Sequence, residues 1–231
     1  MTLNQPVHQT ILFQILQDIY SNPKVGPFLG FKGGSAALLF HHLDRFSVDL
    51  DFDLLDISQK GEVYKEIVKI AKKYGTIKES YEKHFSIFCL ISYEDKSHNI
   101  KIEINQRQFE SRYEIKTYMG VSMMVMVPED MFAHKLMAMH ERIGKTSRDI
   151  YDVWFFLTNR FPINQEIVEK RSNKTFGQLI NKCIHQLEKM NNNNILDGLG
   201  ELLTMSQKDR AKAKLRNETI NLLKLRLENK K

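Results

Sequence analysis

The spacing of apolar residues divides the chain into an α/β first half and a helical second half. Apolar residues recur at helical spacing in residues 7–20 and 59–74, and an apolar helix is expected to follow Ser35. Short alternating or apolar runs predict the strands. They cover residues 28–31, 46–54, 84–93, 99–107 and 122–127, with a turn at 94–99. The first half is therefore expected to form a small mixed β-sheet with flanking helices.

Beyond Pro128 the chain shows helical spacing only. The predicted helices cover residues 128–142, 147–159, 173–190, 194–203 and 206–228, with a linker at 191–194. We therefore predict an α+β fold with a core of residues 1–127, followed by a helical domain of residues 128–231.

The composition is that of an ordinary globular protein. Of its 231 residues, 42% are hydrophobic and 27% are charged, and no apolar run approaches the length of about eighteen residues that suggests a membrane span. The first residues lack the basic-then-apolar pattern of a secretion signal. Cys89 and Cys183 lie far apart in apolar segments, which favours two reduced core thiols over a disulfide. We expect a cytoplasmic protein that does not enter a membrane.

Positive charge is concentrated at the C-terminal end of a chain whose net charge is +6. Within residues 208–231 only Asp209, Glu218 and Glu228 oppose the basic residues. The basic residues are Lys208, Arg210, Lys212, Lys214, Arg216, Lys224, Arg226, Lys230 and Lys231. Two interpretations are open: a solvated helix face, or a surface that contacts the phosphate backbone of a nucleic acid.

Three aspartates alternate with apolar residues in the segment FSVDLDFDL. In a strand, Asp49, Asp51 and Asp53 would lie on one face, where like charges repel. A divalent cation would remove the repulsion, and Mg²⁺ prefers carboxylate oxygens and phosphates as ligands. The alternative is an edge strand with a solvated acidic face.

A Gly-Gly-Ser turn precedes this acidic segment by one helix. Gly33 and Gly34 allow backbone N–H groups to approach a phosphate closely, and Ser35 stands where a helix begins. The alternative is a tight turn in which Ser35 caps the helix. The turn is weak evidence alone, but its combination with the acidic pair indicates a site for a metal-bound polyphosphate.

The motif FKGGS followed by VDLDF resembles the pattern of the DNA-polymerase-β-like nucleotidyltransferases. The longer string GFKGGSAALLFHHLDRFSVDLDF is similar to the AbiEii/AbiGii toxin group, which includes the MenT-like enzymes. Arg45, Phe46, Ser47, Asp49 and Asp51 match that group residue by residue. The resemblance covers residues 28–157, and the helical tail is similar only in general character.

The resemblance implies roles for the first block. Asp49 and Asp51 would hold Mg²⁺, with Mn²⁺ as the alternative, on the triphosphate of a nucleotide. The nucleotide itself would contact Lys32, Gly33, Gly34 and Ser35. Glu103 is the candidate for the third metal ligand that many relatives carry on a neighbouring strand. The alternative for Glu103 is a structural ion pair with a lysine.

A second block, PEDMFAHKLMAMHERIGKTSRDIYDVWFF, matches a lysine helix followed by an R-D-x-x-D motif in the same group. The matching residues are Lys135, Arg148, Asp149 and Asp152. Lys135 would contact the triphosphate or, alternatively, reach from an apolar stripe to water. Helix 147–159 is apolar on nearly all sides, so its carboxylates need partners, and a structural ion pair with Arg148 or Lys135 is the alternative to catalysis. Asp149 is the expected active-site acid, while Arg45, Arg148 and Asp152 would support the site.

The predicted function is metal-dependent transfer of a nucleotide from a nucleoside triphosphate to an acceptor, with release of pyrophosphate. The resemblance implies an RNA acceptor such as the 3′ end of tRNA, and an antitoxin protein as partner. Two alternatives stay open. One is a nucleotidyltransferase for small molecules such as antibiotics, and the other is a non-catalytic module that binds nucleotide or RNA.

Overall fold

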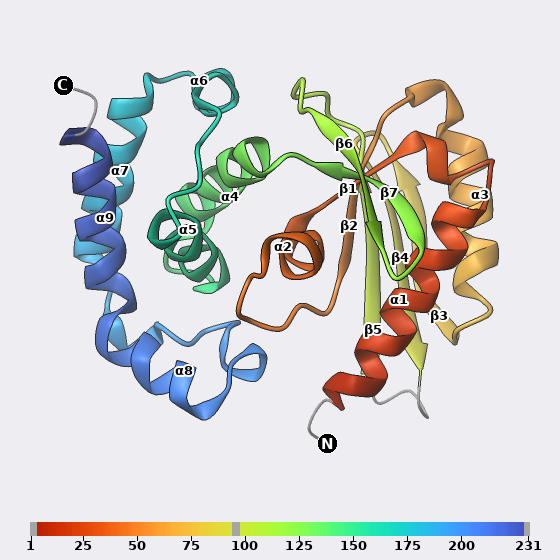
Figure 1. The fold of residues 1–231 in the computed structure, drawn as a ribbon, viewed down its shortest axis with the longest axis horizontal. Coiled ribbons are helices and arrows are strands. Elements are labelled where there is room, and N and C mark those ends of the chain that lie inside the picture. The colour runs from red at the N-terminus through yellow and green to blue at the C-terminus, as the bar shows by residue number, and fades with distance from the viewer. Residues whose placement is uncertain (1–3, 94–97, 229–231) are drawn as a thin grey trace. The chain divides into compact units, whose positions relative to one another are not determined.

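The computed structural model describes residues 4–93 and 98–228 and divides into two compact units (Figure 1). The first unit contains residues 46–108 and 112–127 together with the chain up to His42. The second contains Leu43–Arg45, Phe109–Ser111 and the chain from Pro128 onward. Two short segments from the first half of the sequence therefore belong to the helical unit.

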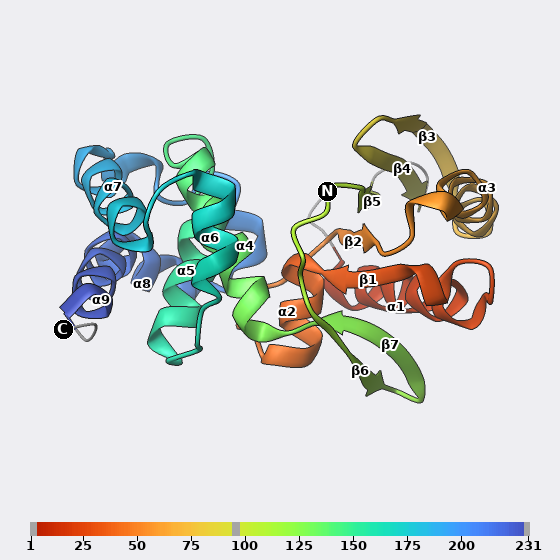
Figure 2. The ribbon, with the colours of Figure 1, turned by 90° about the horizontal axis from the view of Figure 1, so that it is seen from above.

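A seven-stranded mixed sheet forms the centre of the first unit, in the order β3-β4-β5-β2-β1-β7-β6. The strands are β1 (Leu29–Lys32), β2 (Leu50–Leu54), β3 (Thr76–Lys83), β4 (Ser86–Tyr93), β5 (His98–Asn105), β6 (Tyr113–Tyr118) and β7 (Val121–Met126). β2 pairs antiparallel with β1 and parallel with β5, while β1 pairs parallel with β7. The β3–β4 and β6–β7 pairs are antiparallel and form the two edges (Figure 2).

Helices cover both faces of this sheet (Figure 1). They are α1 (Gln5–Ser21), α2 (Gly33–His41) and α3 (Lys60–Ala71), with 3₁₀ turns at Gly26–Phe28 and Ile57–Gln59. α1 packs on α3 and β7, whereas α2 packs on β1 and β2 from the opposite face. Asn4 caps α1 through its contact with the Val7 amide, and Pro6 stands in the first turn, where it costs no hydrogen bond.

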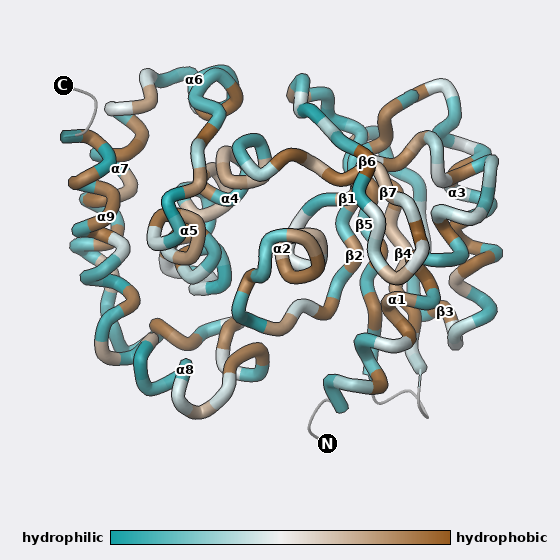
Figure 3. The backbone as a smooth tube through the Cα atoms, viewed as in Figure 1, coloured by the Kyte–Doolittle hydropathy of each residue, from teal (hydrophilic) through white to brown (hydrophobic). Residues whose placement is uncertain are grey.

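The second unit is helical throughout. It contains α4 (Pro128–Arg142), α5 (Arg148–Thr158), α6 (Gln165–Ser172), α7 (Phe176–Lys189), α8 (Met205–Arg210) and α9 (Arg216–Glu228), with a π-helical turn at Ala211–Leu215 and 3₁₀ turns at Asn192–Asn194 and Gly200–Leu202. α5 is the central helix, since every residue from Asp149 to Leu157 is buried. It packs against α4 and α9. Hydrophobic and hydrophilic residues alternate along α7, as expected of a helix with one buried face (Figure 3).

The structure confirms the predicted α+β fold and corrects several elements. The segment 194–203 is not an α-helix: a turn at 195–199 leads into a single 3₁₀ turn at Gly200–Leu202, because Gly198 adopts a positive φ of 68° and interrupts the helical path. β2 begins at Leu50, so Asp49 precedes the strand that was predicted to contain it. Helix α6 and strands β3 and β6 were not predicted, and most of the predicted turn at 94–99 lies outside the described residues. Cys89 and Cys183 are both free and buried, as expected.

Across the described part of the chain, no helix is both long enough and apolar enough to cross a bilayer.

Candidate active site

The glycine turn is in direct contact with the acidic strand. Gly33 begins α2 with a φ of +80°, a conformation that residues with a side chain rarely adopt. A Cβ atom at this position would lie only 2.8 Å from the Cβ of Asp51. Lys32 and Asp51 are paired across β1 and β2, which fixes this close approach. A cation held by Asp51 would therefore lie beside the backbone of the turn.

Ser35 lies inside the first turn of α2 and is almost fully buried. Its hydroxyl donates a hydrogen bond to the backbone carbonyl of Asp49, and the Ser47 hydroxyl lies 3.0 Å away. Lys32, not Ser35, occupies the N-cap position, so the alternative in which Ser35 caps the helix is wrong. The serine instead ties the helix to the backbone of Asp49.

His8 holds the same segment from the other side and was not identified from the sequence. Its ring is fully buried, with Nε2 3.0 Å from the Val48 carbonyl and Nδ1 2.5 Å from the Tyr93 hydroxyl. The Val48 carbonyl can only accept, so Nε2 carries the proton and Nδ1 accepts from Tyr93. The only signal in the sequence was a polar residue on the apolar side of the first helix. His8 and Ser35 together fix the backbone on which Asp49 is carried.

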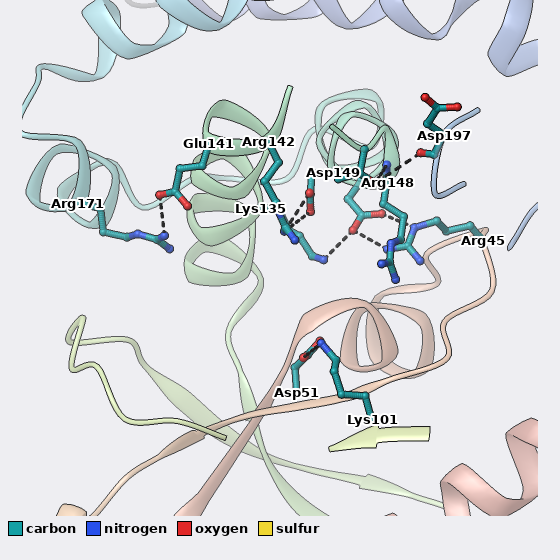
Figure 4. A network of polar contacts seen from close by, with 12 residues as sticks. Arg45, Asp51, Lys101, Lys135, Glu141, Arg142, Arg148, Asp149, Arg171 and Asp197 are labelled. Atoms are coloured by element: carbon teal, nitrogen blue, oxygen red, sulfur yellow. Dashed lines mark hydrogen bonds and ion pairs between the residues drawn. The ribbon is translucent and has the colours of Figure 1, made fainter. Parts of the chain in front are cut away.

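Three carboxylates surround the ammonium group of Lys101. Asp51 and Glu103 are neighbours in the parallel β2–β5 register. The Lys101 Nζ lies 2.8 Å from Glu103 Oε2, 3.7 Å from Asp51 Oδ1 and 3.8 Å from Asp49 Oδ2. Figure 4 shows Lys101 and Asp51 pointing toward each other. Burial alone would lower the pKa of Lys101, but the charges of Asp51, Asp49 and Glu103 raise it above its ordinary value.

Asp53 does not join this cluster, although it alternates with Asp49 and Asp51 along the sequence. Its carboxylate is buried and accepts from Lys32 Nζ at 2.5 Å, Asn105 Nδ2 at 3.0 Å and the Tyr113 hydroxyl at 2.5 Å. Lys32, predicted to contact nucleotide, thus neutralises Asp53 in this structure. The Lys32–Asp53 pair secures the end of β1 immediately before the glycine turn.

The donor set of the cluster fits a hard divalent cation. Asp49, Asp51 and Glu103 present carboxylate oxygens, the ligands preferred by Mg²⁺ and Mn²⁺, and they already converge on one positive charge. Within residues 4–93 and 98–228, no three His, Cys, Asp or Glu side chains stand ready to hold a metal ion as they are. The Lys101 ammonium group lies among the carboxylate oxygens that would hold the ion.

The helical unit contains a second charged cluster, centred on Asp152. This carboxylate is fully buried and receives two hydrogen bonds from Arg45, at 2.6 and 2.7 Å, and Lys135 Nζ lies 2.7 Å from it. Burial alone would raise the pKa of Asp152, but Arg45 and Lys135 hold it well below its ordinary range. Asp152 therefore fixes both cations in place.

Asp149 lies one helical turn before Asp152 and is 3% exposed. Its partner is Arg142, whose guanidinium nitrogen lies 2.9 Å from the carboxylate (Figure 4). Burial raises the pKa of Asp149, and the charges of Lys135 and Arg142 offset only part of this rise. Arg142 was not identified from the sequence, where its place in the last turn of a predicted helix was the only signal.

A mixed sheet carrying a glycine turn beside an acidic strand, followed by a helical unit, is the architecture of a nucleotidyltransferase. The protein JHP933 from Helicobacter pylori has a similar structure, with a TM-score of 0.58 and 19% identity over 100% of this chain and 96% of that one. A second H. pylori structure, described as a candidate nucleotidyltransferase, gives a TM-score of 0.58 and 17% identity over 100% and 99% of the two chains. At these identities the likeness concerns the fold.

The sequence places the chain within one family of this class. The family described as "Nucleotidyl transferase AbiEii toxin, Type IV TA system" matches residues 14–214. The chain belongs to this family and is a nucleotidyltransferase toxin, as the resemblance in its two sequence blocks predicted. A comparison with curated proteins gave no match.

Proposed function

We propose that this toxin transfers a nucleotide from a nucleoside triphosphate to an RNA acceptor, such as the 3′ end of tRNA, in a reaction that depends on Mg²⁺ or Mn²⁺. The observation that carries the proposal is the convergence of Asp49, Asp51 and Glu103 on a single positive charge beside the glycine turn. A bound divalent cation would neutralise charge on the triphosphate and favour attack by the acceptor hydroxyl.

The nucleotide would bind at the start of α2. Backbone N–H groups at a helix N-terminus attract anions, and Gly33 and Gly34 have no side chains that would keep a phosphate at a distance. Ser35 would act chiefly by positioning Asp49 through its hydrogen bond to the Asp49 carbonyl. Lys32 would act through Asp53, whose charge it compensates close to the turn.

The helical unit would supply the remaining groups. Lys135 would stabilise negative charge on the triphosphate. Asp152 would position it, because the Asp152 carboxylate lies 2.7 Å from the Lys135 ammonium group. Asp149 would accept the proton of the acceptor hydroxyl, since burial raises its pKa and makes it a stronger base when ionised. Arg45 and Asp152 would support the site by holding Lys135 in place, and Arg148, in the first turn of α5, is proposed as a further supporting residue.

In the reaction the acceptor hydroxyl attacks the α-phosphorus, the bond from that phosphorus to the bridging oxygen breaks, and pyrophosphate leaves. The chain would contribute mainly by positioning the reactants and by stabilising charge on the phosphoryl oxygens. An RNA acceptor is favoured by the basic C-terminal helices, whose exposed lysines could follow a phosphate backbone. Because the family is one of toxin–antitoxin systems, we also propose an antitoxin protein as partner.

The test is incubation of the protein with each α-labelled nucleoside triphosphate, Mg²⁺ and total RNA. We expect label in RNA, release of pyrophosphate and loss of both on chelation. The Asp49→Asn variant should lose roughly 10²–10³-fold in rate while keeping the wild-type thermal unfolding curve. Asp56→Asn, which changes an exposed acid of the same unit, is the matched control and should retain activity.

Label in a small molecule but not in RNA would overturn the acceptor class. Binding of triphosphate without pyrophosphate release, in the presence of every acceptor tried, would overturn the transfer reaction. Full activity of Asp49→Asn would remove the proposed metal site.

A further inference from the structure

Lys101 lies where the proposed metal site needs a positive charge. Its ammonium group is 2.8 Å from Glu103 and 3.7–3.8 Å from Asp51 and Asp49, so all three proposed ligands face it. Lys101 stands in the middle of β5, the strand that lies between β2 and β4. Lys101 is paired with Leu90 of β4, and β5 pairs with β2 from the next residue onward. The sheet therefore holds the backbone of Lys101, and the side chain is the part that can move away.

Without a cation, these carboxylates would repel one another at close range. The ammonium group of Lys101 reduces this repulsion when no divalent cation is bound. A lysine ammonium and a divalent cation repel each other, so both cannot lie among the same oxygens. The long flexible stem of Lys101, 29% exposed, allows the ammonium group to turn toward solvent when the cation binds.

We propose that Lys101 is a built-in substitute for the metal ion, which keeps Asp49, Asp51 and Glu103 assembled before the cation binds and is displaced when it does. The inference rests on the metal site of the proposed function and adds a residue that opposes metal binding. Lys101 would thus stabilise the metal-free protein and weaken its affinity for the divalent cation. A lysine that faces none of the three proposed ligands would have no effect on the affinity for the metal.

The test compares Mn²⁺ binding and thermal unfolding of the full chain and of Lys101→Met, both freed of metal with a chelator. Methionine keeps the length of the side chain and removes its charge. We expect Lys101→Met to bind Mn²⁺ about tenfold more tightly by calorimetry, because no ammonium group must be displaced. In chelator its unfolding temperature should fall below the wild-type value, and saturating Mn²⁺ should restore it.

Lys116→Met is the matched control. Lys116 is also a strand lysine of the first unit, 30% exposed and paired with a glutamate, Glu114, at 3.0 Å. It faces no proposed metal ligand, so its loss should leave the affinity for Mn²⁺ unchanged. Should Lys101→Met fail to fold in chelator, its folding on addition of Mn²⁺ supports the inference. Lys101→Gln, a second uncharged variant, should bind Mn²⁺ more tightly in the same way.

Equal or weaker Mn²⁺ binding by the Lys101 variants would overturn the inference while leaving the metal site intact. A tightening of the same size in Lys116→Met would overturn it too, because the effect would then be one of net charge. If neither the wild type nor any Lys101 variant binds Mn²⁺, the proposed metal site itself fails, and the inference fails with it.

Discussion

At the scale of single residues, the candidate site depends on distances that leave no room for an added atom. Gly33 combines a positive φ with a close approach to Asp51, so two separate physical reasons exclude a side chain there. Asp152 is the opposite case, since its buried charge is acceptable only because Arg45 and Lys135 compensate it.

Gly33→Ala should lower the free energy of unfolding by roughly 2 kcal/mol or more, because the strain of a positive φ adds to the displacement of Asp51. Gly120→Ala is the control: Gly120 has the same φ of +80°, but a Cβ there meets nothing within 4 Å, so only the strain of about 1 kcal/mol should appear. Urea unfolding measures both. Equal losses in the two variants would show that the close approach to Asp51 has no energetic weight.

Asp152→Ala should destabilise the protein by about 3–5 kcal/mol, because it leaves the buried charges of Arg45 and Lys135 without a partner. The control is Glu188→Ala, which removes an exposed ion pair with Lys224 and should cost at most about 1 kcal/mol. Unfolding in urea compares the two. A loss below about 1 kcal/mol for Asp152→Ala would show that the cluster is not an essential part of the helical unit.

The sequence predicted those parts of the candidate site that a few consecutive residues determine. The turn at Gly33 and the alternation around Asp51 are visible in a few consecutive residues, so the turn and its acidic neighbour could be predicted. The partners could not, because they depend on how the strands pair. Glu103 lies opposite Asp51, and Lys32 is also opposite Asp51 but reaches Asp53 with its side chain. Nothing local to His8 indicates that its ring reaches the carbonyl of Val48, forty residues away.

At the scale of elements, helices and strands were predicted where consecutive residues determine them and missed where pairing with distant segments does. In β4 and β5 buried apolar residues alternate with more exposed ones over most of each strand, and their pattern was clear. β3 and β6 form the edges of the sheet and have largely exposed, charged sequences, so their strand character comes from pairing with β4 and β7. The segment 194–203 has leucines that led to the prediction of a helix, but Gly198 and Gly200 lie between them and no α-helix forms.

In the segment from α8 through the π-helical turn to α9, several lysines are exposed while arginines contact other parts of the helical unit. Arg210 lies over the Trp154 ring and Arg216 donates to the Met190 carbonyl, whereas Lys212 and Lys214 are exposed. If RNA binds here, replacing four lysines by glutamine should weaken binding and reduce the slope of log K against log salt by about 0.7–0.9 for each phosphate that is no longer neutralised. The four are Lys208, Lys212, Lys214 and Lys224.

The control for this charge change is a variant with four glutamines on α3 and the turn that follows it. The lysines replaced there are Lys65, Lys69, Lys72 and Lys73. Both variants alter the net charge by the same amount. A uniform loss of RNA affinity in the two would indicate a net charge effect, and an unchanged salt slope in the first would show that α8 and α9 are scaffold.

The C-terminal end of α2 carries a titratable group that sets a lower pH limit on stability. Burial, together with the nearby charge of Lys116, lowers the pKa of His41 to about 4, while Glu114 and the Met126 carbonyl act in the opposite direction. The unfolded chain therefore binds this proton more tightly than the folded protein. The contribution of His41 to stability is complete above pH 6.5 and is lost as the pH falls toward about 4.

The loss should approach about 3 kcal/mol, since each unit of pKa difference corresponds to about 1.4 kcal/mol. His41→Gln should flatten the stability profile between pH 6.5 and 4.5, measured by urea unfolding at several pH values. His84→Gln, which changes an exposed histidine of the same unit, should keep the wild-type slope. Parallel profiles for His41→Gln and the wild type would exclude a neutral buried His41.

At the scale of the whole molecule, the order of the chain and the structural units do not coincide. The helical unit includes Leu43–Arg45 and Phe109–Ser111 from the first half of the sequence. Arg45 neutralises the buried Asp152, and Ser111 lies 2.7 Å from the ring of His134. A sequence pattern assigns segments to units by their neighbours along the chain, so it could not predict that these residues complete the helical unit.

A fragment of residues 128–231 should therefore be unstable, because Asp152 would keep Lys135 but lose both hydrogen bonds from Arg45. We expect a poorly cooperative thermal transition by circular dichroism and rapid proteolysis, in contrast with the full chain. The same fragment with Asp152→Leu and Lys135→Met removes the buried charges and should be more resistant to protease. A sharp, wild-type-like transition of the unmodified fragment would show that Arg45 is dispensable for folding.

The short segment Leu43–Arg45, which belongs to the helical unit, also limits how the sequence of this toxin can vary. Residues 43–45 belong to the helical unit, yet Ser35 before them and Asp49 after them are joined by a hydrogen bond in the other unit. The stretch between them is thus held at its two ends by the Ser35–Asp49 hydrogen bond and in its middle by the contacts of Arg45 with Asp152. A change in the length of this stretch would disturb either the pairing of Arg45 with Asp152 or the position of Asp49. Related sequences should therefore keep the number of residues between Ser35 and Asp49 constant, even where the residues themselves differ.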